Sequence, residues 1–349
     1  MKSTHRSRSG GSPDKHEIAA AVHDEAIVID ALAFPYICET DYLPRIKQGG
    51  VTASIVTVAY EDSFESAVRK IDALYTEIEN HPDDLAIATT AGDVREAKSN
   101  GKIAIILGFQ DTKPFGADLS LLRVFYRMGV RCMQLVYNGR NLLGDGCCEN
   151  TDCGLSYAGR EVLEEMNRLG ILVDLSHCGD VTTLEAIEHS KDPVAFTHAN
   201  SRTLAISPRN KTDEQLLALV QKGGVVGVTS HPAFVNPKSN NPTLDDLLNH
   251  IAHMTDLIGV EHVGLGMDFV EKYKEDRTVL PASVYWRTKR PDVFGTVADA
   301  VDRPYAKGID SVAMMGNITG GLIDRGYRKA DVLNILGGNF LRLFETVVG

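Results

Sequence analysis

The chain has 349 residues, enough for one large domain or two domains of average size. Its hydrophobic fraction of 43% and charged fraction of 24% are typical of a soluble globular protein. The net charge of −11 argues against a nucleic-acid partner, which would require a basic face, and no apolar run reaches the roughly 20 residues of a membrane span.

The N-terminal segment, residues 1–15, is polar and rich in glycine and serine, which predicts a disordered leader and not a signal peptide. Without an export signal, the sequence predicts a cytoplasmic protein whose cysteines stay reduced. Three of them, Cys147, Cys148 and Cys153, stand in the stretch GDGCCENTDCG, which is not a zinc-finger spacing. We interpret them as free thiols, with a local metal or redox role as the alternative.

Short apolar runs alternate with helical patterns from residue 26 onward. The runs are apolar on both faces, as a parallel sheet covered by helices requires, and the segments between them repeat apolar residues at spacings of three and four. The predicted strands are 26–34, 51–59, 102–110, 131–138, 171–177, 193–200, 225–235 and 262–269. The predicted helices are 63–81, 118–129, 157–170, 180–190, 212–224, 243–259 and amphipathic helix within 321–348.

Eight strands alternating with helices in about 240 residues predict an α/β protein of the (β/α)8 TIM-barrel type. An open, doubly wound sheet is the alternative, but no GxGxxG follows the first strand. We therefore expect a single barrel domain over residues 16–349. Residues 272–310 are richer in proline and charge and predict an irregular excursion from it.

The ends of the predicted strands carry the candidate functional groups, because catalytic residues of such barrels lie at the carboxyl ends of the strands. These ends hold Asp30, Gln110, Tyr137 with Asn138, His177, His198, His231 and Asp268. His177, His198 and Asp268 together suit Zn²⁺ or a similar divalent ion with an open position for water. Alternatively, Asp268 stays off the metal and acts as a general base.

Other polar positions have a structural interpretation beside the functional one. Asp30 can cap a turn, and His231 precedes a proline and can simply shape a loop. Arg209 and Asn210, in ISPRNKTDE, form either a helix-entry loop or a site where the arginine holds a substrate carboxylate with two hydrogen bonds.

Several long blocks of this chain resemble the membrane (renal) dipeptidase family of the amidohydrolase superfamily. They extend from about residue 100 to the C-terminus and read GVRCMQLVYN, EEMNRLGILVDLSH, PVAFTHANSR, SPRN, GGVVGV, HVGLGMDF and GGNFLRLF. The resemblance implies a (β/α)8 barrel of the metallo-dependent hydrolase type. In typical members it also implies a two-zinc site that hydrolyses dipeptides, and it suggests a homodimer.

The resemblance also implies roles for individual residues. His177 and His198 match the two histidines that bind the second metal. Asp268 matches the aspartate of the eighth strand, which contacts the first metal and serves proton transfer. Arg209 matches the arginine that holds the substrate carboxylate.

At other positions the chain departs from the family pattern. Leu32 and Phe34 replace the His-x-Asp pair that binds the first metal, and Gln110 replaces the glutamate that bridges the two metals. Tyr137 replaces a substrate-binding histidine, and Val270 replaces the second acid of Asp-Phe-Asp-Gly. Two neighbouring cations repel each other unless anions bridge them, so we do not expect a two-metal site.

The sequence therefore predicts a dipeptidase-like hydrolase of amide or related C–N bonds in a small, carboxylate-bearing substrate. One divalent metal, zinc, would be held by His177 and His198 with help from Asp268 or Gln110 and would activate water. The predicted catalytic residues are Asp268, His198, Gln110 and Tyr137, and the predicted substrate-binding residues are Arg209, Asn210, Asn138 and His231. The alternatives are a metal-independent enzyme, lyase or isomerase, on a small acid, and a non-catalytic binding protein.

Overall fold

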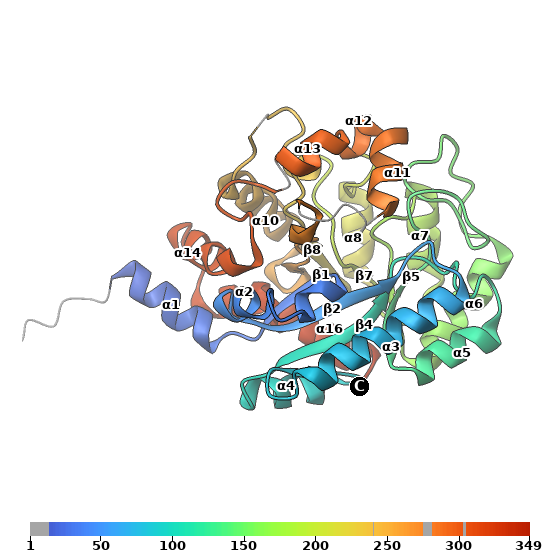
Figure 1. Cartoon of the computed structure of the whole chain (residues 1–349). Helices are drawn as coiled ribbons and strands as arrows, with labels where there is room; N and C mark the ends of the chain where they lie inside the picture. Colours follow the sequence, from blue (N-terminus) through green and yellow to red (C-terminus); the bar gives the residue numbers. More distant parts are fainter. Residues whose placement is uncertain (1–13, 240, 275–280, 303–304) are drawn as a thin grey trace, which may run out of the picture.

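A parallel sheet curved into a barrel and surrounded by helices forms the body of the protein (Figure 1). The computed structural model describes residues 14–239, 241–274, 281–302 and 305–349. The strands are β1 (Val28–Ala33), β2 (Val51–Ala59), β3 (Leu85–Ile87), β4 (Ile103–Phe109), β5 (Val130–Gln134), β6 (Leu172–Asp174), β7 (Ala195–Phe196), β8 (Val225–Val228) and β9 (Val263–Leu265). They pair in parallel in the order β1-β2-β4-β5-β6-β7-β8-β9, and β3 pairs with β4 outside this path. The predicted (β/α)8 barrel is confirmed.

The helices follow the strands along the chain, and many begin at a side-chain cap. The hydroxyls of Thr90, Thr212 and Thr243 each accept a hydrogen bond from the backbone three residues on, in complete capping boxes. The helices are α1 (Lys15–Glu25), α2 (Leu43–Gln48), α3 (Phe64–Asn80), α4 (Ala91–Ser99), α5 (Leu119–Arg127), α6 (Tyr157–Leu169), α7 (Asp180–His189), α8 (Asp213–Gln221), α9 (Pro232–Val235), α10 (Leu244–Ile258), α11 (Pro281–Lys289), α12 (Pro291–Phe294), α13 (Val297–Asp302), α14 (Gly316–Asp324), α15 (Lys329–Leu333) and α16 (Asn339–Val347). Short turns are η1 (Pro35–Cys38), η2 (Val260–His262), η3 (Glu271–Lys274), η5 (Val312–Met314) and η6 (Asn334–Gly338). None of the helices in the described ranges is long and apolar enough to cross a membrane.

Three segments differ from the sequence-based expectation. The leader predicted for 1–15 lies outside the described residues as far as residue 13, and α1 begins within it, at Lys15. The excursion at 272–310 contains the three short helices α11 to α13. The C-terminal helical region is broken after α14, where Gly326 takes a positive φ of 86°, and again at the kink in η6.

The barrel interior is filled with small and branched side chains, and α16 closes its amino-terminal end. Ile29, Leu172 and Val225 stand at or near the starts of their strands, and they pack in one buried cluster with Phe340 and Phe344 of α16. This plug leaves the opposite end, where the strands finish, for a site.

The seam between β9 and β1 is joined through a carboxylate. No regular ladder connects these strands within the described residues, but the backbone N–H of Asp268 donates to the carbonyl of Leu32 at 3.3 Å. The buried Asp30 carboxylate accepts from the backbone N–H groups of Met267 at 2.7 Å and Leu32 at 3.3 Å. Burial raises the pKa of Asp30 to about 7, although these two hydrogen bonds oppose the rise.

The Asp30→Asn variant should therefore become more stable relative to the wild-type chain as the pH rises. The native pKa of Asp30 lies above its unfolded value, so its contribution to stability is complete below pH about 4 and is lost as the pH rises through about 7. The rise in the pKa of Asp30 corresponds to a loss of about 4 kcal/mol in the free energy of unfolding between low and high pH. Urea unfolding of both proteins at about pH 5 and pH 8 should show about 3 kcal/mol of this difference, because part of the loss is complete by pH 5; equal pH dependence of the two would contradict it.

Candidate active site

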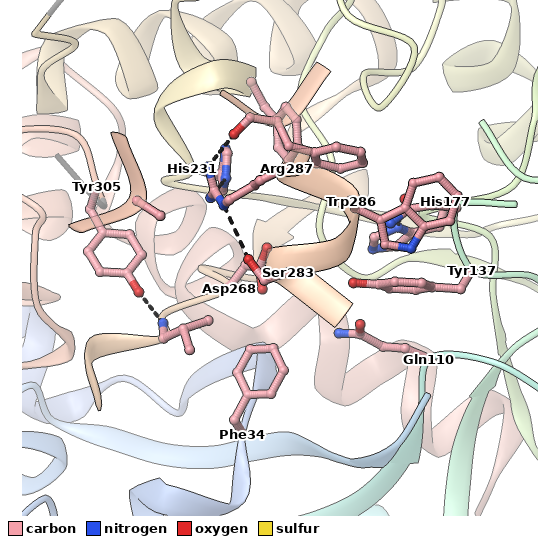
Figure 2. A pocket seen from close by; sticks show the side chains of 15 residues that line it. Phe34, Gln110, Tyr137, His177, His231, Asp268, Ser283, Trp286, Arg287 and Tyr305 are labelled. Atoms are coloured by element: carbon pink, nitrogen blue, oxygen red, sulfur yellow. Dashed lines mark hydrogen bonds between the residues drawn. The ribbon is translucent and has the colours of Figure 1, made fainter. Parts of the chain in front are cut away.

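A cavity opens at the carboxyl ends of the strands, beneath the excursion that carries α11 and α12 (Figure 2). Side chains from the ends of six strands reach it, and the excursion closes one side. The lining residues are Phe34, Gln110, Tyr137, Asn138, His177, His231, Phe234, Asp268, Val270, Ser283, Trp286, Arg287, Phe294, Ala300 and Tyr305. The wall is thus largely aromatic, with a few polar groups, as in many small-molecule sites.

His177 and His198 face each other, as the sequence predicts. Their Nε2 atoms are 2.8 Å apart, and the ring centroids are 4.9 Å apart. His177 lines the cavity, whereas His198 is fully buried behind it. Nδ1 of His177 lies 2.6 Å from Oδ1 of Asn138, which holds the ring in place.

A buried polar group supports His198 from behind. Its Nδ1 atom is 2.8 Å from the hydroxyl of Thr197, and this hydroxyl donates to the Asp174 carboxylate at 2.7 Å. Ser176 donates to the same carboxylate at 2.5 Å through its hydroxyl and at 2.9 Å through its backbone N–H. The orientation of His198 is therefore fixed by the ends of β6 and β7 together.

The surroundings of both imidazoles disfavour the protonated form. Burial lowers the pKa of His177 and of His198 well below the usual range, and the nearby charge of Arg209 lowers each further. The separation of 2.8 Å between the two Nε2 atoms is a hydrogen-bond distance.

Asp268 occupies the cavity with an unusual backbone. It is the one residue other than glycine with a positive φ in the part of the chain that the structure describes, at 60°. Such backbone strain is concentrated at functional positions. Burial raises the pKa of its carboxyl to about 7, and the charges of Arg209 and Arg287 partly oppose the rise.

Tyr137 and Gln110 stand beside Asp268 in the cavity. The Tyr137 ring stacks on His177 with centroids 4.4 Å apart and an interplanar angle of 27°. Nε2 of Gln110 is buried and has no hydrogen-bond partner among the described residues. In Figure 2 the polar ends of both side chains point toward the space in front of Asp268. Two donors and one titratable carboxyl thus share that space.

Arg209 and Asn210 do not line the cavity. The guanidinium of Arg209 is buried and donates to the backbone carbonyls of Ser176 at 2.5 Å and His198 at 3.3 Å. The amide of Asn210 donates to the carbonyls of Ala205 and Phe234 at 2.8 and 2.9 Å. In this conformation both residues bind backbone carbonyls, and the carboxylate clamp at Arg209 stays a prediction.

The excursion supplies functional side chains that the sequence analysis missed. Nη2 of Arg287 in α11 donates to Nε2 of His231 at 2.6 Å, and its Nε donates to Ser283 at 3.2 Å. His231 in turn stacks on Phe234, with centroids 4.2 Å apart. Arg287 is the one lysine or arginine among the described residues that line the cavity. No periodicity or motif distinguishes it in the sequence.

The residues at this site do not fit the metal centre of the family. No group of three or more His, Cys, Asp or Glu in the described ranges could hold an ion, so Asp268 does not complete a set with His177 and His198. Two nitrogens bound to one tetrahedral zinc would lie about 3.3 Å apart, farther than the hydrogen-bonded pair. Phe34 and Val270 line the cavity without any ligand atom.

Comparisons with known proteins agree with the resemblance seen in the sequence. Residues 28–280 match the family model described as membrane dipeptidase (peptidase family M19). Dipeptidase verJ of Clonostachys rogersoniana is 30% identical over 310 residues, which are 88% of this chain and 71% of that protein. An uncharacterized dipeptidase of Schizosaccharomyces pombe, C965.12, is 38% identical over 219 residues, which are 61% of this chain and 52% of that protein.

Solved structures share the fold over nearly the whole chain. An amidohydrolase from Pseudomonas aeruginosa has a TM-score of 0.86 at 32% identity, covering 95% of this chain and 99% of that one. A metallo peptidase from Rhodobacter sphaeroides, liganded with a phosphinate mimic of the dipeptide L-Ala-D-Ala, has a TM-score of 0.77 at 21% identity, covering 92% and 99%. The chain belongs to the membrane dipeptidase family, peptidase family M19, and is a dipeptidase-like hydrolase by that membership.

Proposed function

We propose that this protein hydrolyses an amide bond in a small, carboxylate-bearing substrate, with Asp268 as the general base. The observation that supports the proposal is the shared space in the cavity between the Asp268 carboxyl, whose pKa is about 7, and the donors of Gln110 and Tyr137. A base with a pKa near the working pH transfers protons efficiently. Dipeptides are the substrate class that the names of the relatives suggest.

The proposed reaction needs three groups of this chain. Asp268 accepts a proton from a water molecule as the water oxygen attacks the amide carbon. The N–H of Gln110 and the O–H of Tyr137 donate to the carbonyl oxygen, on which negative charge develops. The C–N bond then breaks, and the amine leaves with the proton returned by Asp268.

The substrate carboxylate would lie toward Arg287 and His231. Arg287 carries the positive charge at the cavity wall, whereas Arg209 lies behind His198 and acts on the cavity through its charge. Asn138 would act by holding His177 and not by binding the substrate itself. The aromatic residues Phe234, Trp286 and Phe294 would contact the apolar part of the substrate.

A single zinc ion, as predicted from the sequence, would be held by His177 and His198. When bound at such a site, a zinc ion lowers the pKa of a coordinated water. The pair lacks a third protein ligand among the described residues, so we assign no step to a metal.

We expect well under one equivalent of zinc, manganese, cobalt or nickel in protein purified without chelator. Two neutral imidazoles alone bind a divalent ion weakly compared with a three-ligand site. Elemental analysis by mass spectrometry gives the content, and His177→Ala is the control for adventitious binding elsewhere. One equivalent of metal that is lost in His177→Ala would show that the pair binds an ion after all.

The Asp268→Asn variant should lose kcat by about 100-fold to 10,000-fold, because an amide cannot accept the proton of water. Asparagine tolerates the same left-handed backbone, so the fold should be retained. Steady-state assays on a dipeptide panel measure the loss, and Asp256→Asn, an exposed carboxylate on α10, is the matched control. Unchanged hydrolysis in Asp268→Asn would exclude this base.

The pH profile of kcat/KM should rise through about pH 7, because the base must be deprotonated and Asp268 titrates there. The positive charge of Arg287 lowers the pKa of Asp268, so Arg287→Met should move this limb to higher pH. A limb that stays in place in Arg287→Met would show that another group sets it.

A second candidate is a lyase or isomerase acting on a small acid. The observation that favours it is a near-neutral carboxyl in a cavity without a three-ligand metal group in the described residues. Reaction in ¹⁸O-labelled water separates the two: hydrolysis places the label in the product carboxylate, whereas elimination or isomerisation does not.

We also propose a cytoplasmic location, consistent with six cysteines that form no disulfide. The net charge of −11 argues against nucleic acid as a partner, and a homodimer is the assembly that the family resemblance suggests.

A further inference from the structure

The loop after β5 places two neighbouring thiols between the imidazole pair and the excursion. Sγ of Cys147 and Sγ of Cys148 are 4.0 Å apart, and both side chains are partly exposed. The backbone fixes this position, because N–H of Cys147 donates to the carbonyl of His177 at 2.8 Å and N–H of Cys148 donates to that of Asn138 at 2.9 Å.

Each thiol contacts a different part of the site. Sγ of Cys147 is 3.7 Å from Oδ1 of Asn138, the atom that holds Nδ1 of His177. Cys148 packs against the small apolar cluster of Phe234, Val293 and Phe294, against which Trp286 packs as well. The carbonyl of Cys148 also accepts a hydrogen bond from Arg290, between α11 and α12, at 2.8 Å.

We propose that Cys147 and Cys148 are a vicinal dithiol that hydroperoxides oxidise reversibly to an intrachain disulfide, which alters the cavity. One thiolate attacks the terminal peroxide oxygen, the O–O bond breaks, and the leaving alkoxide takes a proton to become an alcohol. The second thiol attacks the resulting sulfenic sulfur, forms the S–S bond and releases water. The two thiols lose two electrons and two protons, and the hydroperoxide is reduced to alcohol and water.

Bond formation must disturb the contacts on at least one side. The sulfurs have to approach from 4.0 Å to about 2.0 Å. This movement draws Cys147 away from Asn138, or Cys148 away from the apolar cluster of Phe234, Val293 and Phe294. Consecutive Cα atoms are about 3.8 Å apart, less than the roughly 4.4–6.8 Å usual for disulfides, so the bond would be strained and easily reduced.

Thiol counting tests the proposal without any assay of activity, so its outcome is independent of the proposed function. The background is Cys153→Ala, because Cys153 is exposed on the same loop and could form other disulfides. After treatment with hydrogen peroxide, this protein should lose two alkylatable thiols under denaturing conditions and recover both with dithiothreitol. Adding Cys148→Ser should abolish the paired, reversible loss.

The sole tryptophan provides a second readout. Trp286 packs in the cluster that Cys148 contacts, so peroxide should change the intrinsic fluorescence in Cys153→Ala and not in Cys153→Ala/Cys148→Ser. The proposal is overturned if two thiols are still lost with Cys148 replaced, if no reversible loss occurs, or if non-reducing electrophoresis shows that the bond joins two chains.

Discussion

The hydrogen bond between Nε2 of His177 and Nε2 of His198 organises this site. At 2.8 Å the two rings bind each other directly at the carboxyl ends of β6 and β7. The imidazoles keep this arrangement because their surroundings favour the neutral form. Desolvation and the buried charge of Arg209 both act against protonation, and Asn138 and Thr197 fix the outer nitrogens. The pairing of the two histidines therefore rests on groups of this chain that surround them.

Two buried cations bind backbone carbonyls in the same region. Arg209 bonds to the carbonyls at the ends of β6 and β7, and Lys211 donates to the carbonyls of Leu175 and Cys178 at 2.8 and 3.2 Å. Burial lowers the pKa of Lys211 to about 8. These side chains close the strand ends and act on the cavity through their charge. The positive charge that lines the cavity belongs instead to Arg287, which lies on α11 in the excursion and not on a strand or helix of the barrel.

The barrel and the histidine pair could be predicted from the sequence because both follow from regular patterns. Long apolar strands such as β2 and β4 are evident from composition, and the ends of strands in a parallel barrel must converge. β3 was missed because its short apolar run stands between Asp84 and Thr89, whereas the equally short β6 and β9 lie within longer apolar runs. Arg287 and Trp286 were missed for another reason. Their segment is not part of the strand–helix alternation of the barrel, and its place over the cavity is set by the folding of the whole chain. Arg209 lay where the family resemblance suggests, but which groups its guanidinium contacts is decided by packing and not by position in the sequence.

The left-handed backbone at Asp268 limits which residues this position can hold. Branched and bulky side chains are unfavourable there, whereas glycine, asparagine and aspartate adopt the conformation readily. A homologue that keeps this turn can therefore carry asparagine or glycine in place of Asp268 without a change in the backbone. A descendant without the acid would keep the backbone of this turn and the cavity around it, and so would retain the ability to bind the same ligands.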